Sequence, residues 1–108
     1  MVEHSARTDA REVFDLDEAL RRGERYIRAG ADGLFIEAPL DLDELERIGR
    51  TFDVPQLANM LEGGRTPFLT PAELEQLGFR IVICGISLLM HAVQTMTNVL
   101  ADVVDCQI

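Results

Sequence analysis

The sequence has few cysteines, no excess of basic residues and no long uninterrupted hydrophobic run. Its two cysteines, Cys84 and Cys106, lie far apart and have no second Cys or His at metal-ligand spacing. This spacing argues against a zinc site and against a disulfide-based fold. The net charge of −9 at pH 7 argues against nucleic acid or an anionic membrane surface as a partner. An anionic small ligand would therefore need a local arginine to hold it.

The longest apolar stretch, residues 81–93, is interrupted by Cys84, Gly85, Ser87 and His91. It is too short to span a bilayer, and we divide it into a strand and the start of a helix. The first residues carry charges and no hydrophobic signal core. We therefore expect a protein without a secretory leader, located in the cytoplasm with reduced thiols.

The composition is that of a folded globular protein, with 47% hydrophobic and 27% charged residues. The length predicts a single domain that spans residues 1–108. A chain of this size buries roughly two thirds of the surface of its unfolded form, so we expect a modest hydrophobic core.

Segments typical of strands and of helices alternate along the chain. Leu34, Phe35 and Ile36 form an apolar run without polar alternation, which is typical of a parallel strand buried on both faces. Apolar spacing, capping residues and glycines at helix ends define the other segments. We predict strands near residues 5–9, 33–37, 56–60 and 80–84 and helices near residues 16–29, 42–52, 71–77 and 87–104.

Four successive βα units with short connections favour right-handed parallel crossovers and an α/β fold. Four units are half of a (β/α)8 TIM barrel, and they also fit a small open sheet. A half barrel leaves unpaired edge strands and an inner sheet face without an opposite wall. Burial of that face would require a homodimer, a complementary N-terminal half, or a different packing of the C-terminal helix.

Three polar residues, Arg7, Glu37 and Asn59, fall at or near the C-terminal ends of successive predicted strands. In a parallel barrel those ends face one common mouth, so we expect these side chains to converge. The arginine suits a carboxylate, the amide is both donor and acceptor, and the glutamate can take a hydroxyl proton or orient a metal-bound water. The set suits a small carboxylate or phosphonate ligand. The structural alternatives are that Arg7 pairs with Asp9 or Asp32 and that Asn59 caps the loop.

The loop EGGRTP, at residues 62–67, contains glycines whose backbone amides can approach an anion. It matches neither dinucleotide-binding nor P-loop spacing, and a flexible connection is the simpler interpretation. His91 lies among apolar residues of the last predicted helix, and we interpret it as structural. Met60, Met90 and Met96 occupy apolar positions, and we predict that they fill the core.

Three segments occur in a distinctive order: ARTDAR at residues 6–11, AGADGLFIEAP at residues 29–39 and LANMLEGGRTP at residues 57–67. The segment LGFRIVI at residues 77–83 follows them. Together they resemble the isocitrate lyase and phosphoenolpyruvate mutase superfamily over most of residues 6–96. The resemblance implies a (β/α)8 barrel enzyme that makes or breaks C–C or P–C bonds in 2-oxo or 2-hydroxy acids. It also implies Mg2+ and an enolate or enolpyruvate intermediate.

The resemblance assigns a role to each of the three strand-end residues. Arg7 would match the family's substrate-carboxylate arginine, Glu37 its carboxylate at the end of the next strand, and Asn59 its substrate-contacting asparagine. The pair Gly63 and Gly64 resembles the branch of carboxyphosphonoenolpyruvate mutase, dimethylmalate lyase and oxaloacetate decarboxylase more than the methylisocitrate lyases.

Family members are more than twice as long, and this chain corresponds to the second half of their barrel. The first half would carry the aspartates that hold Mg2+ and the mobile loop with the catalytic cysteine. Because the metal-holding aspartates belong to the first half, we predict no metal ligand in this chain. Neither Cys84 nor Cys106 lies in the sequence setting of the catalytic loop, so we also predict no catalytic residue. The resulting hypothesis is a truncated lyase or mutase that is inactive alone. The alternative is a non-catalytic half-barrel protein that acts through homo-oligomeric assembly.

Overall fold

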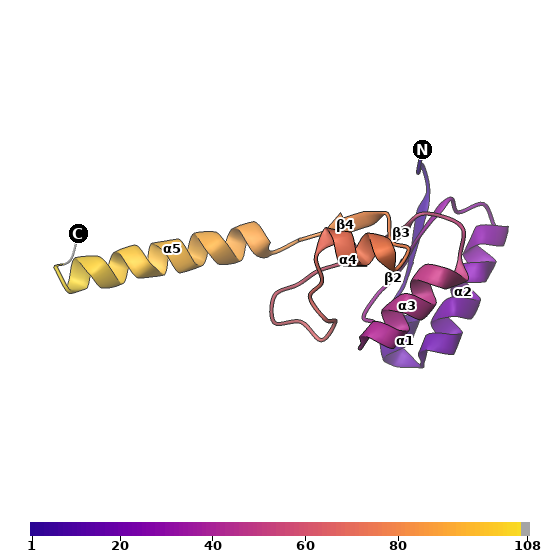
Figure 1. Cartoon of the computed structure of the whole chain (residues 1–108), viewed down its shortest axis with the longest axis horizontal. Coiled ribbons are helices and arrows are strands. Elements are labelled where there is room, and N and C mark those ends of the chain that lie inside the picture. The colour runs from indigo at the N-terminus through magenta and orange to yellow at the C-terminus, as the bar shows by residue number, and fades with distance from the viewer. Residues whose placement is uncertain (107–108) are drawn as a thin grey trace.

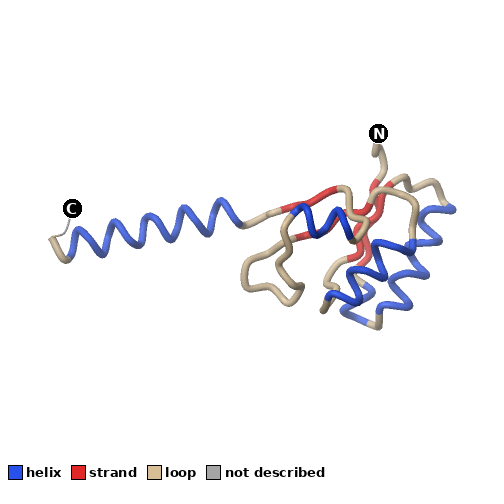
Figure 2. The backbone as a smooth tube through the Cα atoms, viewed as in Figure 1, coloured by secondary structure: helices blue, strands red, loops and turns tan. Residues whose placement is uncertain are grey.

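A computed structural model, which describes residues 1–106, shows a parallel four-stranded sheet in the order β1-β2-β3-β4. Each strand pairs with its neighbour in the sequence (Figure 2). The α/β fold predicted from the sequence is confirmed. The elements in chain order are β1 (Ser5–Thr8), α1 (Ala10–Val13), α2 (Leu16–Arg28), β2 (Gly33–Ile36), α3 (Leu42–Thr51), β3 (Gln56–Asn59), α4 (Pro71–Gln76), β4 (Ile81–Ile83) and α5 (Ser87–Val104).

Helices α2, α3 and α4 each begin at a residue whose side chain caps the helix. Asp15 and Asp41 each accept a backbone N–H from the first turn of α2 and α3. Thr70 and Glu73 form a reciprocal capping box at the start of α4. Gly78, with a φ of 102°, lies just beyond the end of that helix, in the left-handed region that favours glycine.

Helices α2, α3 and α4 cover one face of the sheet (Figure 1). Ile36 and Ala58 point from the strands into a buried core, where they join Leu45, Ile48 and Leu74 from the helices. Full burial of such aliphatic side chains contributes roughly 1.5–3 kcal/mol each. The hydrophobic core therefore lies entirely on this side of the sheet.

The opposite face of the sheet is open to solvent. The strand register places Arg7, Phe35, Leu57 and Ile81 in one row across the four strands. All four side chains are at least partly exposed, whereas their neighbours on the helix-covered side are mostly buried. We call the side that carries this row the open face. It corresponds to the inner face of the half barrel expected from the sequence.

Helix α5 extends away from the rest of the molecule (Figure 1), so that the whole structure measures 61 × 30 × 23 Å. None of its residues is buried. The prediction that Met90 and Met96 fill the core is therefore wrong, whereas Met60 is 1% exposed and does fill it. The pattern of apolar residues predicted a helix correctly but not what the helix packs against. Within residues 1–106, no helix combines the length and the hydrophobicity needed to cross a membrane.

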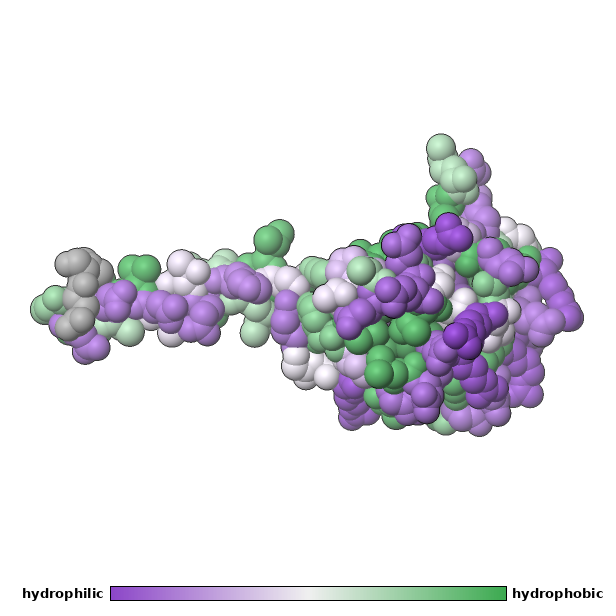
Figure 3. Space-filling model, in the orientation of Figure 1, coloured by the Kyte–Doolittle hydropathy of each residue, from purple (hydrophilic) through white to green (hydrophobic). Residues whose placement is uncertain are grey.

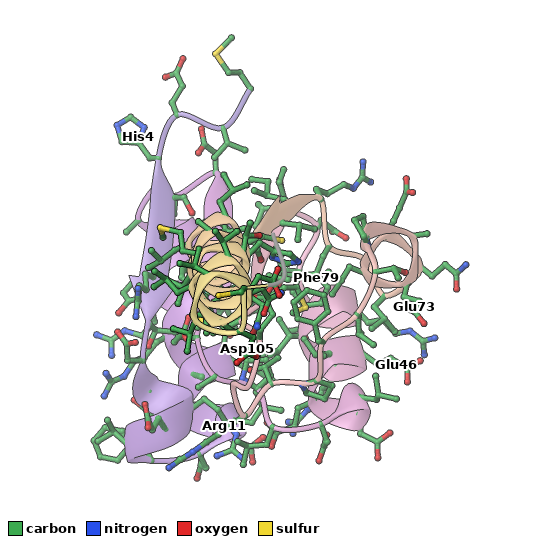
Figure 4. All side chains as sticks on the ribbon, turned by 90° about the vertical axis from the view of Figure 1, so that its left-hand side faces the viewer. His4, Arg11, Glu46, Glu73, Phe79 and Asp105 are labelled. Carbon is green, nitrogen blue, oxygen red and sulfur yellow. The ribbon has the colours of Figure 1, made fainter. Side chains whose placement is uncertain are left out.

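A partly buried ion pair fixes α1 against the start of α3. Nε of Arg11, which is labelled in Figure 4, lies 2.7 Å from Oε2 of Glu44, and each side chain is less than a fifth exposed. The hydrogen bond from Arg11 lowers the pKa of the Glu44 carboxyl, against the opposing effect of burial. Because the folded-state pKa is lowered, the pair stabilises the fold above the ordinary glutamate pKa and is lost as the pH falls.

Candidate functional site

The C-terminal edge of the sheet brings Glu37 and Asn59 together. Glu37 directly follows β2, and Asn59 is the last residue of β3. Both line one cavity of about 180 Å³, together with Arg65 and Thr66 from the loop after β3. The expected convergence therefore holds for these two residues.

Arg7 lies on the open face of β1 but does not line this cavity; it lines a separate cleft that shares no lining residue with it. Its Nη2 lies 2.8 Å from Oδ1 of Asp9, and its guanidinium carbon lies 5.0 Å from the centroid of the Phe35 ring. The hydrogen bond to Asp9 raises the pKa of Arg7, and the charge of Glu37 acts in the same direction. Of the two alternative partners, Asp9 is the one observed. Asp32 instead accepts backbone N–H groups from the segment before β1.

Two oxygen atoms of the site accept no hydrogen bond from the part of the chain that the structure describes. They are Oε2 of Glu37 and Oδ1 of Asn59, and both are buried. Buried polar atoms nearly always have a partner, and leaving one unpaired costs about 1–3 kcal/mol. A ligand hydroxyl can donate to either atom. Among the described residues, Glu37 and Asn59 therefore each carry an acceptor oxygen without a partner beside the cavity.

The backbone directly after Glu37 is strained at Ala38, whose φ of 61° places this residue in the left-handed region. This conformation costs a non-glycine residue roughly 1–2 kcal/mol. Oγ1 of Thr66 donates a hydrogen bond of 2.7 Å to the carbonyl oxygen of Pro39, the residue that follows Ala38. Strain that the surrounding structure maintains is common at ligand-binding sites.

The loop at residues 62–67 is tethered on both sides, although its sequence favoured a flexible connection. Thr66 holds it to the segment after β2, and Glu62 accepts a hydrogen bond from the hydroxyl of Ser87 at the start of α5. The hydrogen bond from Ser87 lowers the pKa of Glu62. Sequence reasoning considered the loop amides and missed Arg65 and Thr66 as lining residues. The sequence did hold one signal for these two residues: they lie a few positions after a predicted strand that ends in the polar residue Asn59.

The residues of the site do not form a magnesium site of their own. Across residues 1–106, no group of three or more His, Cys, Asp or Glu side chains gathers closely enough to hold a metal ion. The cavity contains two carboxylates, those of Glu12 and Glu37, but Arg65 lies 3.7 Å from the first of them. A nearby guanidinium opposes binding of a divalent cation.

Parallel βα units whose strand ends present polar side chains to one cavity are typical of α/β barrels. The family model described as phosphoenolpyruvate phosphomutase matches residues 4–104. The chain belongs to this family, within the isocitrate lyase and phosphoenolpyruvate mutase superfamily, and the resemblance stated from the sequence is confirmed.

Similar proteins include lyases of two kinds. The chain is 50% identical to 2,3-dimethylmalate lyase of Eubacterium barkeri, over 86% of this chain and 32% of that protein. It is 45% identical to 2-methylisocitrate lyase of Bacillus subtilis, over 81% of this chain and 29% of that protein. Because both kinds appear, the branch within the family stays a prediction.

Solved structures share the same fold. The structure of oxaloacetate acetylhydrolase with the product oxalate matches with a TM-score of 0.88 and 27% identity, over 96% of this chain and 36% of that chain. The structure of 2,3-dimethylmalate lyase matches with a TM-score of 0.86 and 30% identity, over 96% of this chain and 37% of that chain. The chain thus spans roughly a third of the length of its relatives, which confirms a partial barrel.

Proposed function

We propose that this chain supplies the carboxylate-binding part of a lyase or mutase that acts on 2-oxo or 2-hydroxy carboxylic acids. The observation that carries the proposal is the cavity shared by Glu37 and Asn59, with Arg7 on the same face of the sheet. Arg7 would exchange its exposed pair with Asp9, which is worth about 0–1 kcal/mol, for a bidentate contact with the ligand carboxylate. Glu37 and Asn59 would accept the ligand hydroxyl.

The reaction would need groups that lie outside these 108 residues. The family resemblance implies Mg2+, and the described residues offer it no ligand set. We propose that the metal ligands and the acid–base groups come from the part of the barrel that this chain does not contain, on the same polypeptide or on another one. The 108 residues alone would bind a carboxylic acid without converting it.

The carboxylate site is tested by thermal unfolding with and without oxalate. At ten times its Kd, a ligand stabilises a fold by about 1.4 kcal/mol, which raises the Tm of a domain this size by about 6 °C or more. We expect this shift in the wild-type chain and its loss in Arg7→Ala. The matched control is Arg50→Ala, which removes an exposed arginine from α3. An equal oxalate shift in Arg7→Ala and the wild-type chain would contradict the site.

Helix α5 favours a second function, homo-oligomeric assembly. Apolar side chains recur along one side of the helix at alternating spacings of four and three residues, and all are 46–66% exposed. This spacing is typical of a helix that packs against another helix. Figure 3 shows hydrophobic and hydrophilic groups on the projecting helix. The apolar side consists of Leu89, Val93, Met96, Leu100 and Val103, and the polar side of His91, Gln94, Thr95, Asn98 and Asp102.

A second copy of the chain is the partner that this helix suits best. The apolar side carries no charge that would select a different chain, and two identical sides would cover each other. In this alternative the protein acts as a non-catalytic half barrel through its assembly.

The assembly is tested by the solution mass from light scattering. We expect about twice the 12.1 kDa of one chain. Met96→Glu places a charge in the middle of the apolar side and should yield the monomer mass. Asn98→Glu adds the same charge on the polar side and should leave the mass unchanged. A wild-type monomer would contradict the proposal.

A further inference from the structure

Arg65 is the basic residue that lines the cavity shared by Glu37 and Asn59. Its side chain is 76% exposed, and its Nη1 lies 3.7 Å from Oε1 of Glu12. Arg7 lines a different cleft and has a shorter contact with its own carboxylate partner: its Nη2 lies 2.8 Å from Oδ1 of Asp9. The two arginines therefore occupy different places at this edge of the sheet, and Arg65 is the more weakly held.

Two chemically different kinds of group line the cavity. Glu37 and Asn59 each carry a buried acceptor oxygen without a hydrogen-bond partner among the described residues, and such an oxygen would repel an anionic group and bind a hydroxyl. Arg65 carries a guanidinium, whose fork of donors matches a carboxylate. An exposed ion pair such as that with Glu12 is weak, so an incoming acid group can displace it.

The volume limits the ligand. About 180 Å³ is smaller than the pockets that hold drug-sized ligands. A short acid with one hydroxyl group and one remote acid group would place the hydroxyl beside Glu37 and Asn59 and the acid group beside Arg65.

We propose that Arg65 determines specificity by binding a second, remote acid group of the ligand, and that Glu12 competes with the ligand for it. This inference rests on the proposed function, in which Arg7 binds the first carboxylate. Glu12 is well placed to compete, because the Arg11–Glu44 pair fixes the short helix α1 that carries it. The two residues should therefore have opposite effects on affinity.

The test compares malate with lactate, two 2-hydroxy acids that differ in a remote carboxylate. NMR titrations of the full chain measure both affinities, and spectra confirm that each variant is folded. We expect wild type to prefer malate by about tenfold, the effect of one hydrogen-bonded charge pair. Arg65→Ala should remove this preference and leave lactate binding unchanged. Glu12→Gln should increase the preference several-fold, because the competing carboxylate is gone.

The control variant is Arg80→Ala, which removes the same charge at the start of β4, away from the cavity. It should change neither affinity by more than twofold. An unchanged malate preference in Arg65→Ala would overturn the role of Arg65, and the proposed function would stand if Arg7→Ala still abolished binding of both acids. Unchanged binding in Arg7→Ala would instead overturn the carboxylate role of Arg7. Failure of the wild-type chain to bind either acid would overturn both.

Discussion

The variant Gly49→Ala is expected to lose about 3 kcal/mol or more of folding stability, the largest effect that we predict. A Cβ atom at Gly49 would lie 1.7 Å from the backbone oxygen of Leu77 and 2.8 Å from its carbonyl carbon. The oxygen belongs to the backbone and cannot rotate away, so α3 and the end of α4 would have to separate. This separation would open the core around Ile48 and Leu74.

Urea denaturation at one fixed protein concentration measures this loss, since the concentration matters if the chain assembles. The matched control is Gly85→Ala. A Cβ atom there would meet only the Ile83 side chain, at 3.8 Å. We expect the control to change the free energy of unfolding by less than about 0.5 kcal/mol. A stability of Gly49→Ala equal to that of the control would show that the two helices do not pack this closely.

The variant Gln56→Ala is expected to destabilise the fold by about 2–3 kcal/mol. Gln56 is 1% exposed, and its Nε2 donates to the backbone oxygens of Ile48 and Gly49, at 2.8 and 3.3 Å. These oxygens belong to the last turns of α3, where carbonyl groups lack partners within the helix. Truncation would leave both acceptors buried and unpaired and would also create a cavity.

Gln94→Ala is the control for this variant. Gln94 lies on α5 and donates to Asn98 on the same exposed side of the helix. Its truncation should cost less than about 0.5 kcal/mol. Equal urea midpoints for the two variants would mean that Gln56 does not cap α3.

The secondary structure was largely predictable because its signals are local. Asp15, Asp41 and Thr70 are capping residues that the sequence displays directly, and the apolar run before Glu37 identifies β2. The short helix α1 was not predicted, because its four residues have no side-chain cap. The direction of α5 was not predictable either, since apolar spacing defines a helix face but not the surface that covers it.

The candidate site was predictable as far as strand ends determine it. The placement of Glu37 and Asn59 follows from the rule that parallel strands place their C-terminal ends at one edge of the sheet. Arg7 had two possible partners in the sequence, and the choice of Asp9 depends on side-chain geometry. The placement of Arg65 depends on the hydrogen bond from Thr66 to a carbonyl 27 residues earlier in the chain, which no local pattern reveals.

Binding of a carboxylic acid to Arg7 on the open face underlies the proposed function. Titration of the isotope-labelled chain with oxalate, followed by amide and arginine side-chain NMR shifts, tests this binding most directly. We expect saturable shifts that centre on Arg7 and disappear in Arg7→Ala. Shifts confined to the outer surfaces of α2 and α3, or no shifts at any oxalate concentration, would contradict it.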